Sequence, residues 1–269
     1  MNVGKLIRLN RLFSHPSGRL CSVAVDHLLG YSHGLPPGLR HMIKTLSAVA
    51  AGRPDAVTMH KGIAASAWAP YAGKIPLIVQ STLARPDDTA RQQAATPEDA
   101  VRLGADAFAV AAFVHGLTEA DYLRVVADCV REAARFEIPV ICHIYPRDPQ
   151  GNIVFTPDDI AWAAHCAVEL GADVVKVPYC GDVQAYSQIV ADSPVPLVAA
   201  GGPQCKTLRQ ALTMMSEVVR SGARGATIGR NIWGFEQITA AVRAFKAVIH
   251  DGKTAAEAMA AAGLTDDQS

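Results

Sequence analysis

Short apolar runs alternate with amphipathic segments along most of this 269-residue chain. In three places a glycine ends an amphipathic helix and a short apolar strand follows at once: RLGADAFAV at 102–110, ELGADVVKV at 169–177 and RSGARGATIG at 220–229. Glycine suits the left-handed backbone conformation that commonly ends a helix. The repeated junction predicts a chain built from successive β/α units.

Counting outward from these junctions predicts eight strands, each apolar along its length, as expected of parallel strands buried on both faces. They are 19–26, 55–59, 75–81, 106–114, 139–145, 173–178, 195–200 and 225–229. Eight parallel strands close into a (β/α)8 barrel, the TIM barrel. We expect one such domain over residues 1–269, with a short amino-terminal lead-in and a carboxyl-terminal helix and tail. An open doubly wound sheet uses the same units and is the alternative.

The segments between the predicted strands have the pattern of helices. In 118–136, apolar residues recur at helical spacing and charged residues mark the other face. Thr156 precedes Pro157 and two aspartates, a combination that predicts the first turn of another helix.

The charge balance restricts the kind of partner. The 25 basic and 25 acidic residues cancel, so no global field attracts nucleic acid or an anionic membrane, and we expect neither partner. The amino terminus lacks a signal-peptide pattern and no apolar stretch reaches about 18 residues, so a cytoplasmic location is expected. The six cysteines form no CxxC pair and are interpreted as reduced core thiols rather than a disulfide framework or zinc site.

Lys176 is a charged residue inside an otherwise apolar predicted strand, GADVVKVPY. Burial of a lysine favours the neutral amine over the ammonium. A neutral amine is a nucleophile toward carbonyl carbon, so this position indicates Schiff-base chemistry. A lysine that reaches solvent at the strand end, or pairs with a carboxylate, is the alternative interpretation.

Active sites of (β/α)8 barrels lie at the carboxyl ends of the strands, so the residues there are candidates. In strand order they are Asp26 and His27, His60 and Lys61, His115, His143 and Tyr145, Lys176 and Tyr179, Gly201 and Gly202, and Gly229 and Arg230. Phosphate commonly binds to backbone N–H groups after strands seven and eight. The pattern therefore predicts a phosphate site at Gly201, Gly202, Gly229 and Arg230, although glycines at strand ends also form plain turns.

Acid/base candidates lie on the first and fifth strands. Tyr145 comes two residues after His143, so both side chains project to one face of the strand. The Tyr145 phenol is a candidate for proton transfer, and Asp26 is a candidate for orienting Lys176 and exchanging protons. Simple packing before a proline explains Tyr145 equally well, and loop capping explains Asp26.

Five motifs resemble the class I, archaeal-type fructose-bisphosphate aldolases, a group within the deoxyribose-phosphate aldolase superfamily. They are VDH at 25–27, YPRD at 145–148, GADVVKVPYCGD at 171–182, AGGPQ at 200–204 and GRNIW at 229–233, in the family's order. The resemblance implies that Lys176 forms the Schiff base, Tyr145 is the general acid/base and Asp26 is the active-site aspartate. It also implies the phosphate-binding role of the two glycine loops with Arg230, no metal or other cofactor, and a homo-oligomer, commonly a decamer of pentamer rings.

Three segments depart from the family pattern at the barrel mouth. His143 stands where the fructose-bisphosphate enzymes have a tryptophan, the loop after His27 reads LLGYSHGLPPG, and the fourth strand ends in FVHGLTE with His115. These changes affect substrate contacts more than the amine chemistry. We expect His27 and His143 to bind substrate.

The expected function is reversible aldol cleavage or condensation of a phosphorylated ketose through Lys176. A related barrel enzyme, such as a thiolase or a transaldolase-like synthase acting on a phosphorylated dione or amino-sugar precursor, is the main alternative. A metal-dependent aldolase would use the histidines at the strand ends, although they lack HxH or HxxxH spacing. A non-catalytic barrel that binds a phosphorylated metabolite remains the alternative outside enzymes.

Overall fold

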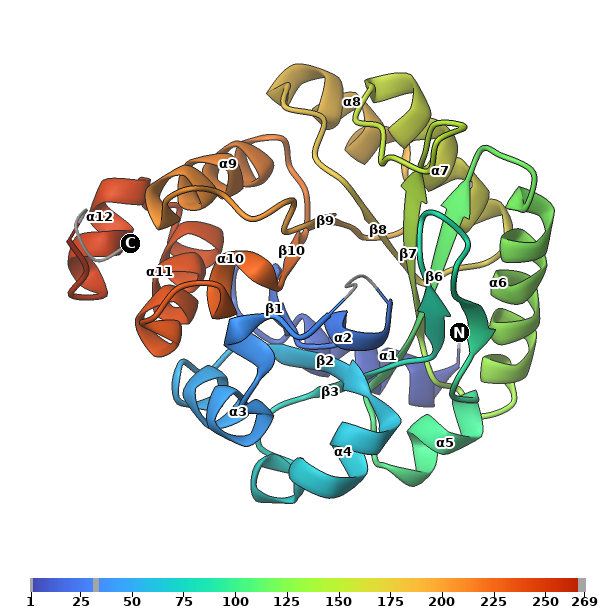
Figure 1. The fold of residues 1–269 in the computed structure, drawn as a ribbon, viewed down its shortest axis with the longest axis horizontal. Coiled ribbons are helices and arrows are strands. Elements are labelled where there is room, and N and C mark those ends of the chain that lie inside the picture. Colours follow the sequence, from blue (N-terminus) through green and yellow to red (C-terminus); the bar gives the residue numbers. More distant parts are fainter. Residues whose placement is uncertain (1, 31–33, 266–269) are drawn as a thin grey trace.

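Eight parallel strands close into a barrel in the computed structural model, which describes residues 2–30 and 34–265 (Figure 1). The barrel order is β1-β10-β9-β8-β7-β6-β3-β2, so β1 pairs with both β10 and β2. This closure confirms the (β/α)8 barrel and rules out the open sheet. The barrel strands are β1 (Leu20–Ala24), β2 (Ala56–His60), β3 (Leu77–Gln80), β6 (Ala107–Val114), β7 (Val140–Pro146), β8 (Val174–Val177), β9 (Leu197–Ala200) and β10 (Gly225–Ile228).

Helices surround the barrel and connect its strands (Figure 1). They are α1 (Val3–Leu12), α2 (His27–Gly30), α3 (Met42–Ala51), α4 (Lys61–Ala67), α5 (Pro97–Arg102), α6 (Glu119–Ala134), α7 (Pro157–Glu169), α8 (Val183–Asp192), α9 (Leu208–Arg220), α10 (Arg230–Trp233), α11 (Ile238–Asp251) and α12 (Ala255–Ala261), with 3-10 turns η1 (Pro37–Leu39) and η2 (Ala69–Tyr71).

The local helix signals are confirmed. Helix α6 lies within the predicted range 118–136. Helix α7 begins after Thr156, whose hydroxyl accepts a hydrogen bond from the Asp159 backbone N–H at 3.3 Å. Each such cap satisfies a donor that the first helical turn leaves unpaired.

The amino-terminal segment is more than a lead-in. Helix α1 buries Leu12 fully beneath the barrel, where it contacts the inward side chains of the lower strand ends. This floor cluster comprises Leu12, Leu20, Ala56, Ile78, Ala107, Ala109, Ile141, Val174 and Val198. A second departure is an antiparallel hairpin above β3, formed by β4 (Thr82–Ala84) and β5 (Arg91–Gln93), which the apolar pattern did not predict.

A polar layer lies directly above the apolar floor. Side chains alternate across a strand, so the residue two positions after an inward floor residue also points inward. On five strands these second positions are polar, namely Ser22, Thr58, Gln80, His143 and Lys176, and all five are buried. The barrel interior is therefore apolar below and largely polar above, at the carboxyl ends of the strands.

The structure also bears on the predictions about the cysteines and about membrane spans. The six cysteines are free thiols, of which Cys21, Cys129 and Cys142 are buried. Within residues 2–30 and 34–265, no helix has both the length and the apolar character needed to cross a bilayer. Residues 31–33 of the altered mouth loop and the tail from residue 266 lie outside the described residues.

Candidate active site

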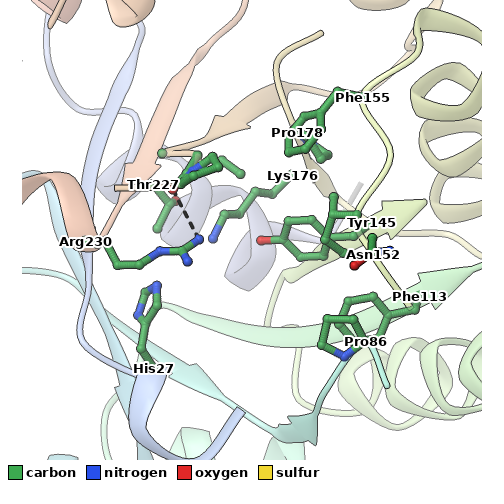
Figure 2. Close-up of a pocket in the computed structure, with 16 residues that line it drawn as sticks. His27, Pro86, Phe113, Tyr145, Asn152, Phe155, Lys176, Pro178, Thr227 and Arg230 are labelled. Atoms are coloured by element: carbon green, nitrogen blue, oxygen red, sulfur yellow. Dashed lines mark hydrogen bonds between the residues drawn. The ribbon is translucent and has the colours of Figure 1, made fainter. Parts of the chain in front are cut away.

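A cavity of about 300 Å³ opens at the carboxyl end of the barrel (Figure 2). It brings together seven of the nine predicted site residues, which come from five different strands or the loops after them. These seven are His27, Tyr145, Lys176, Gly201, Gly202, Gly229 and Arg230. The remaining wall is largely apolar and comprises Pro86, Phe113, Asn152, Ile153, Phe155, Pro178, Ala200, Pro203 and Thr227.

Lys176 lies on β8 and is only 5% exposed. Its neighbours Val175 and Val177 belong to the core between barrel and helices, so the lysine side chain points into the barrel. In Figure 2 the Tyr145 hydroxyl points toward the Lys176 amine, and both groups line the cavity. An amine held in a largely buried cavity beside a phenol is an arrangement suited to carbonyl addition with proton transfer.

Tyr145 is held by aromatic packing and by a rigid strand end. Its ring lies tilted against Phe113, with the ring centroids 5.9 Å apart. Beyond it, the buried Arg147 donates from Nε to the His115 carbonyl oxygen at 3.1 Å and pairs with Asp88 at 3.0 Å. Arg147 also stacks over Phe113, with its guanidinium carbon 5.6 Å from the ring centroid. These contacts fix the end of β7, so the position of the phenol is determined by packing.

Asp26 and His143 are buried, with exposures of 3% and 1%, and do not line the cavity. Gln80 on β3 joins them: its Nε2 lies 3.1 Å from Asp26 Oδ2 and 3.2 Å from His143 Nδ1. The inward alanines Ala109 and Ala111 on the intervening strand β6 leave room for this contact. His143 does not line the cavity, and its substrate contact stays a prediction.

The Asp26 carboxylate is surrounded by donors and positive charge. Its Oδ1 lies 3.3 Å from His27 Nδ1, and His60 Nε2 donates to its backbone carbonyl oxygen at 3.2 Å. Burial by itself raises the pKa of Asp26, but the His27 hydrogen bond and the charges of His27, Lys176 and His60 outweigh it and hold this pKa well below its usual value. Asp26 is therefore an anion at neutral pH.

His143, in contrast to Asp26, is held in its uncharged form. Burial, together with the positive charge of Lys176, lowers the pKa of His143 well below its usual 6.5, against a smaller opposing effect of Asp26. The two buried residues that Gln80 connects are thus a carboxylate and a neutral imidazole. The barrel interior around Lys176 therefore holds one negative charge and one uncharged imidazole.

The two glycine loops meet at the far side of the cavity. Gly202 has a φ of +71°, a conformation that L side chains rarely adopt, and Arg230 donates to its carbonyl oxygen at 3.3 Å. At Gly229 a Cβ atom would lie 2.3 Å from His27 Cε1, so only glycine lets the imidazole pack there. The predicted phosphate-binding residues are thus brought together along one side of the cavity, beside the Arg230 guanidinium.

Two residues that fix these loops escaped the sequence interpretation. Asn231 is buried and donates from Nδ2 to the Gly201 and Pro203 carbonyl oxygens at 2.7 and 2.9 Å, while its Oδ1 accepts from the Cys205 N–H at 2.8 Å. Trp233 donates from Nε1 to the Ala24 carbonyl oxygen at 2.9 Å. Both lie in the GRNIW motif, which marked them in the sequence, but their partners are far away in the chain, after β9 and on β1.

The histidines at the strand ends do not gather into a metal site. His115 turns outward from the cavity, lies 3.1 Å from Asp159 through Nε2 and stacks on Trp162 with ring centroids 6.4 Å apart. Among the residues described by the structure, no group of three or more His, Cys, Asp or Glu side chains is placed to hold a metal ion.

Comparison with known proteins agrees with the geometry. A curated relative from Streptomyces griseus, 2-amino-4,5-dihydroxy-6-oxo-7-(phosphonooxy)heptanoate synthase, is 31% identical over 96% of this chain and 94% of its own. A second, 2-amino-3,7-dideoxy-D-threo-hept-6-ulosonate synthase from Halobacterium salinarum, is 33% identical over 99% of both chains. The crystal structure of an archaeal fructose 1,6-bisphosphate aldolase superposes with a TM-score of 0.81 at 27% identity, covering 92% of this chain and all of that one.

The family itself follows from the match over most of the chain. The model described as DeoC/LacD family aldolase matches residues 21–234, from the first barrel strand to the end of the GRNIW motif. The resemblance to archaeal class I aldolases predicted from the motifs is confirmed by this match and by the superposition. The chain is an aldolase of the DeoC/LacD family.

Proposed function

We propose that this aldolase works through a Schiff base on Lys176 and acts on a phosphorylated ketone. The observation that carries the proposal is the cavity itself, in which the Lys176 amine and the Tyr145 hydroxyl share one space with Arg230 and the Gly201, Gly202 and Gly229 loops (Figure 2). The loops bind the phosphate and so position the carbonyl carbon against the amine.

The reaction follows from these positions. In condensation, the Lys176 amine adds to the ketone carbon and water leaves, which gives a protonated imine. Loss of a proton from the adjacent carbon converts the imine to an enamine, whose carbon forms the new bond to the aldehyde carbon. Tyr145 gives a proton to the oxygen of that aldehyde, and water then releases the product from the lysine. Cleavage runs through the same steps in reverse, with Tyr145 taking the hydroxyl proton and Asp26 holding its charge next to the cationic imine.

The chemistry of the relatives' products suggests the donor. A 2-amino-4,5-dihydroxy-6-oxo-7-(phosphonooxy)heptanoate, cut between C4 and C5, yields dihydroxyacetone phosphate and a four-carbon amino-acid aldehyde. Fructose 1,6-bisphosphate, cut in the corresponding place, yields dihydroxyacetone phosphate and glyceraldehyde 3-phosphate. Both products contain the same three-carbon phosphorylated ketone, so we propose dihydroxyacetone phosphate as the donor for this chain.

Borohydride trapping tests the nucleophile and the donor together. The wild-type protein incubated with dihydroxyacetone phosphate and borohydride should gain the mass of one reduced adduct, and peptide mapping should find it on Lys176. The Lys176→Met variant should gain none, while a Lys61→Met variant, which changes an exposed lysine at another strand end, should be labelled like the wild type. A full-strength adduct at another lysine contradicts the assignment.

A synthase that uses an amino-acid aldehyde as acceptor is the second candidate. It is favoured by the two synthase relatives, which align over nearly the whole chain at 31% and 33% identity. Product analysis with dihydroxyacetone phosphate and either glyceraldehyde 3-phosphate or the four-carbon amino aldehyde distinguishes the two acceptors. Coenzyme A with a phosphorylated dione tests the thiolase alternative in the same assay.

The homo-oligomer implied by the motif resemblance is a separate proposal. We propose that the chain assembles with copies of itself, with the decamer as the specific size to examine. Light scattering on the purified protein measures the assembly mass directly, and a monomer across the micromolar range contradicts the proposal.

A further inference from the structure

The strongest unassigned feature is the Gln80 side chain, which is buried beneath the cavity, does not line it and contacts both Asp26 and His143. The backbone N–H of Thr82 donates to Gln80 Oε1 at 3.1 Å. A backbone N–H only donates, so Oε1 must face it and the amide nitrogen must face Asp26. A reversed amide would place Oε1 against the carboxylate and the NH₂ group against the Thr82 N–H. Two contacts therefore fix the orientation of the amide.

This orientation fixes the proton on His143. The Gln80 nitrogen carries two hydrogens and no acceptor, so one donates to Asp26 Oδ2 and the other to His143 Nδ1. An Nδ1 that accepts a hydrogen bond carries no proton, and the single proton of the neutral ring then lies on Nε2. Burial and the Lys176 charge favour the neutral ring as well, because they lower the pKa of His143.

We infer that Gln80 is a positioning residue that holds the Asp26 carboxylate in place and keeps His143 as the neutral Nε2–H tautomer beside Lys176. The inference rests on the proposed Schiff base. Strand pairing sets His143 beside Lys176, since the two residues are register partners of β7 and β8. A protonated imine on Lys176 is a cation that the Asp26 carboxylate offsets. An imidazolium at His143 would add a second positive charge next to the imine and oppose its formation.

The groups that face this network come from several strands. His27 and His60 contribute positive charge near Asp26 when protonated, and Lys176 acts on both Asp26 and His143. Gln80 is the member that contacts both acidic and basic partners without titrating itself. Its removal therefore changes the protonation of the layer without removing an ionisable group.

Histidine ¹⁵N spectroscopy on the wild-type protein tests the tautomer. In protein labelled with ¹⁵N-histidine, the signals that disappear in His143→Gln identify the ring. We expect Nδ1 without a proton and Nε2 with one, unchanged from pH 6 to pH 9. A protonated Nδ1, or a His143 ring that titrates within this range, overturns the inference.

The pH profile of kcat/KM tests the positioning role. In Gln80→Leu the neutral His143 ring loses the donor to its Nδ1, which makes protonation of the ring easier, so we expect the acid limb of the profile to move up by about one pH unit and kcat to fall roughly tenfold. Ser22→Ala is the matched control, since its buried hydroxyl, in the same polar layer, has no hydrogen-bond partner among the described residues, and its removal should leave the profile unchanged. An acid limb in Gln80→Leu that coincides with the wild type overturns the inference.

These measurements separate the inference from the proposed function. Borohydride trapping reports on Lys176 alone, whereas the tautomer is read without substrate. The predicted tautomer with no Lys176 adduct means that the Schiff-base proposal fails while the hydrogen-bond network stands. A Lys176 adduct together with a proton on His143 Nδ1 means that the Schiff-base proposal stands while the inferred hydrogen-bond network fails. The wild-type spectrum decides the question even when Gln80→Leu does not fold.

Discussion

Replacing Gly229 by alanine tests whether the eighth-strand loop needs glycine for space. The added Cβ would lie 2.3 Å from His27 Cε1, 2.8 Å from His27 Nε2 and 3.1 Å from the Ala24 carbonyl oxygen. The ring contact is too short for any carbon pair, so the imidazole must move. That movement weakens the 3.3 Å contact with Asp26 and the edge-on contact with Trp233, whose ring centroid is 5.2 Å away.

The magnitude follows from the cost of overpacking. Inserting one carbon into a packed site that must shift typically costs about 1–3 kcal/mol of unfolding free energy. We expect Gly229→Ala to lose this amount in urea denaturation and to raise KM for dihydroxyacetone phosphate, because the loop proposed to hold the phosphate is displaced. Gly62→Ala is the control: it lies in α4, and beyond its own helix the described residues place no atom within 4 Å of the new Cβ, so it should be neutral or stabilising by up to about 1 kcal/mol.

A double variant identifies the clash as the cause. His27→Ala removes the atoms that the new Cβ would meet, so Gly229→Ala in that background should cost at least about 1 kcal/mol less than in the wild type. The remaining 3.1 Å contact with the Ala24 carbonyl oxygen needs only a small shift. Equal stability of Gly229→Ala and the wild type, or strict additivity with His27→Ala, refutes the steric argument.

Three further changes probe the loops and the buried charges. Asn231→Ala removes two donors and one acceptor that join the glycine loops, so unfolding experiments should show a loss of about 1–3 kcal/mol and kinetics a higher KM for the phosphorylated donor. Because the pKa of Asp26 is lowered in the folded protein, its ionised carboxylate stabilises the fold at pH values above the ordinary pKa of 3.8, and this contribution is lost as the pH falls below that value. Asp26→Asn should therefore flatten the acid side of a profile of unfolding free energy against pH. An unchanged profile contradicts the ionised state. The neutral His143 in the folded state costs stability below its ordinary pKa of 6.5, by up to about 1.4 kcal/mol per pH unit, so stability should fall more steeply from pH 6.5 to 5 in the wild type than in His143→Gln.

Much of the barrel was readable from the chain because its signals are local. The glycine junctions at 104, 171 and 222 precede strands β6, β8 and β10, and all eight predicted strands overlap the observed ones. The closed barrel could be predicted from the number of strands, because eight parallel strands that are buried on both faces are typical of the (β/α)8 fold. The hairpin β4–β5 was missed because its two strands are only three residues long and β5 is exposed, so the sequence contains no apolar run that marks them.

The sequence by itself determined which residues stand at the strand ends, and so placed Lys176, Tyr145 and the glycine loops near one another. Only the tertiary structure decided which of the candidates are accessible: Lys176 and Tyr145 line the cavity, whereas Asp26 and His143 are buried and do not line it. Gln80 gave no signal, because its partners are 54 and 63 residues away. Strand periodicity is a property of neighbouring residues, but a hydrogen bond across a closed barrel depends on register and on the small alanines of the strand between, which exist only once the barrel has formed.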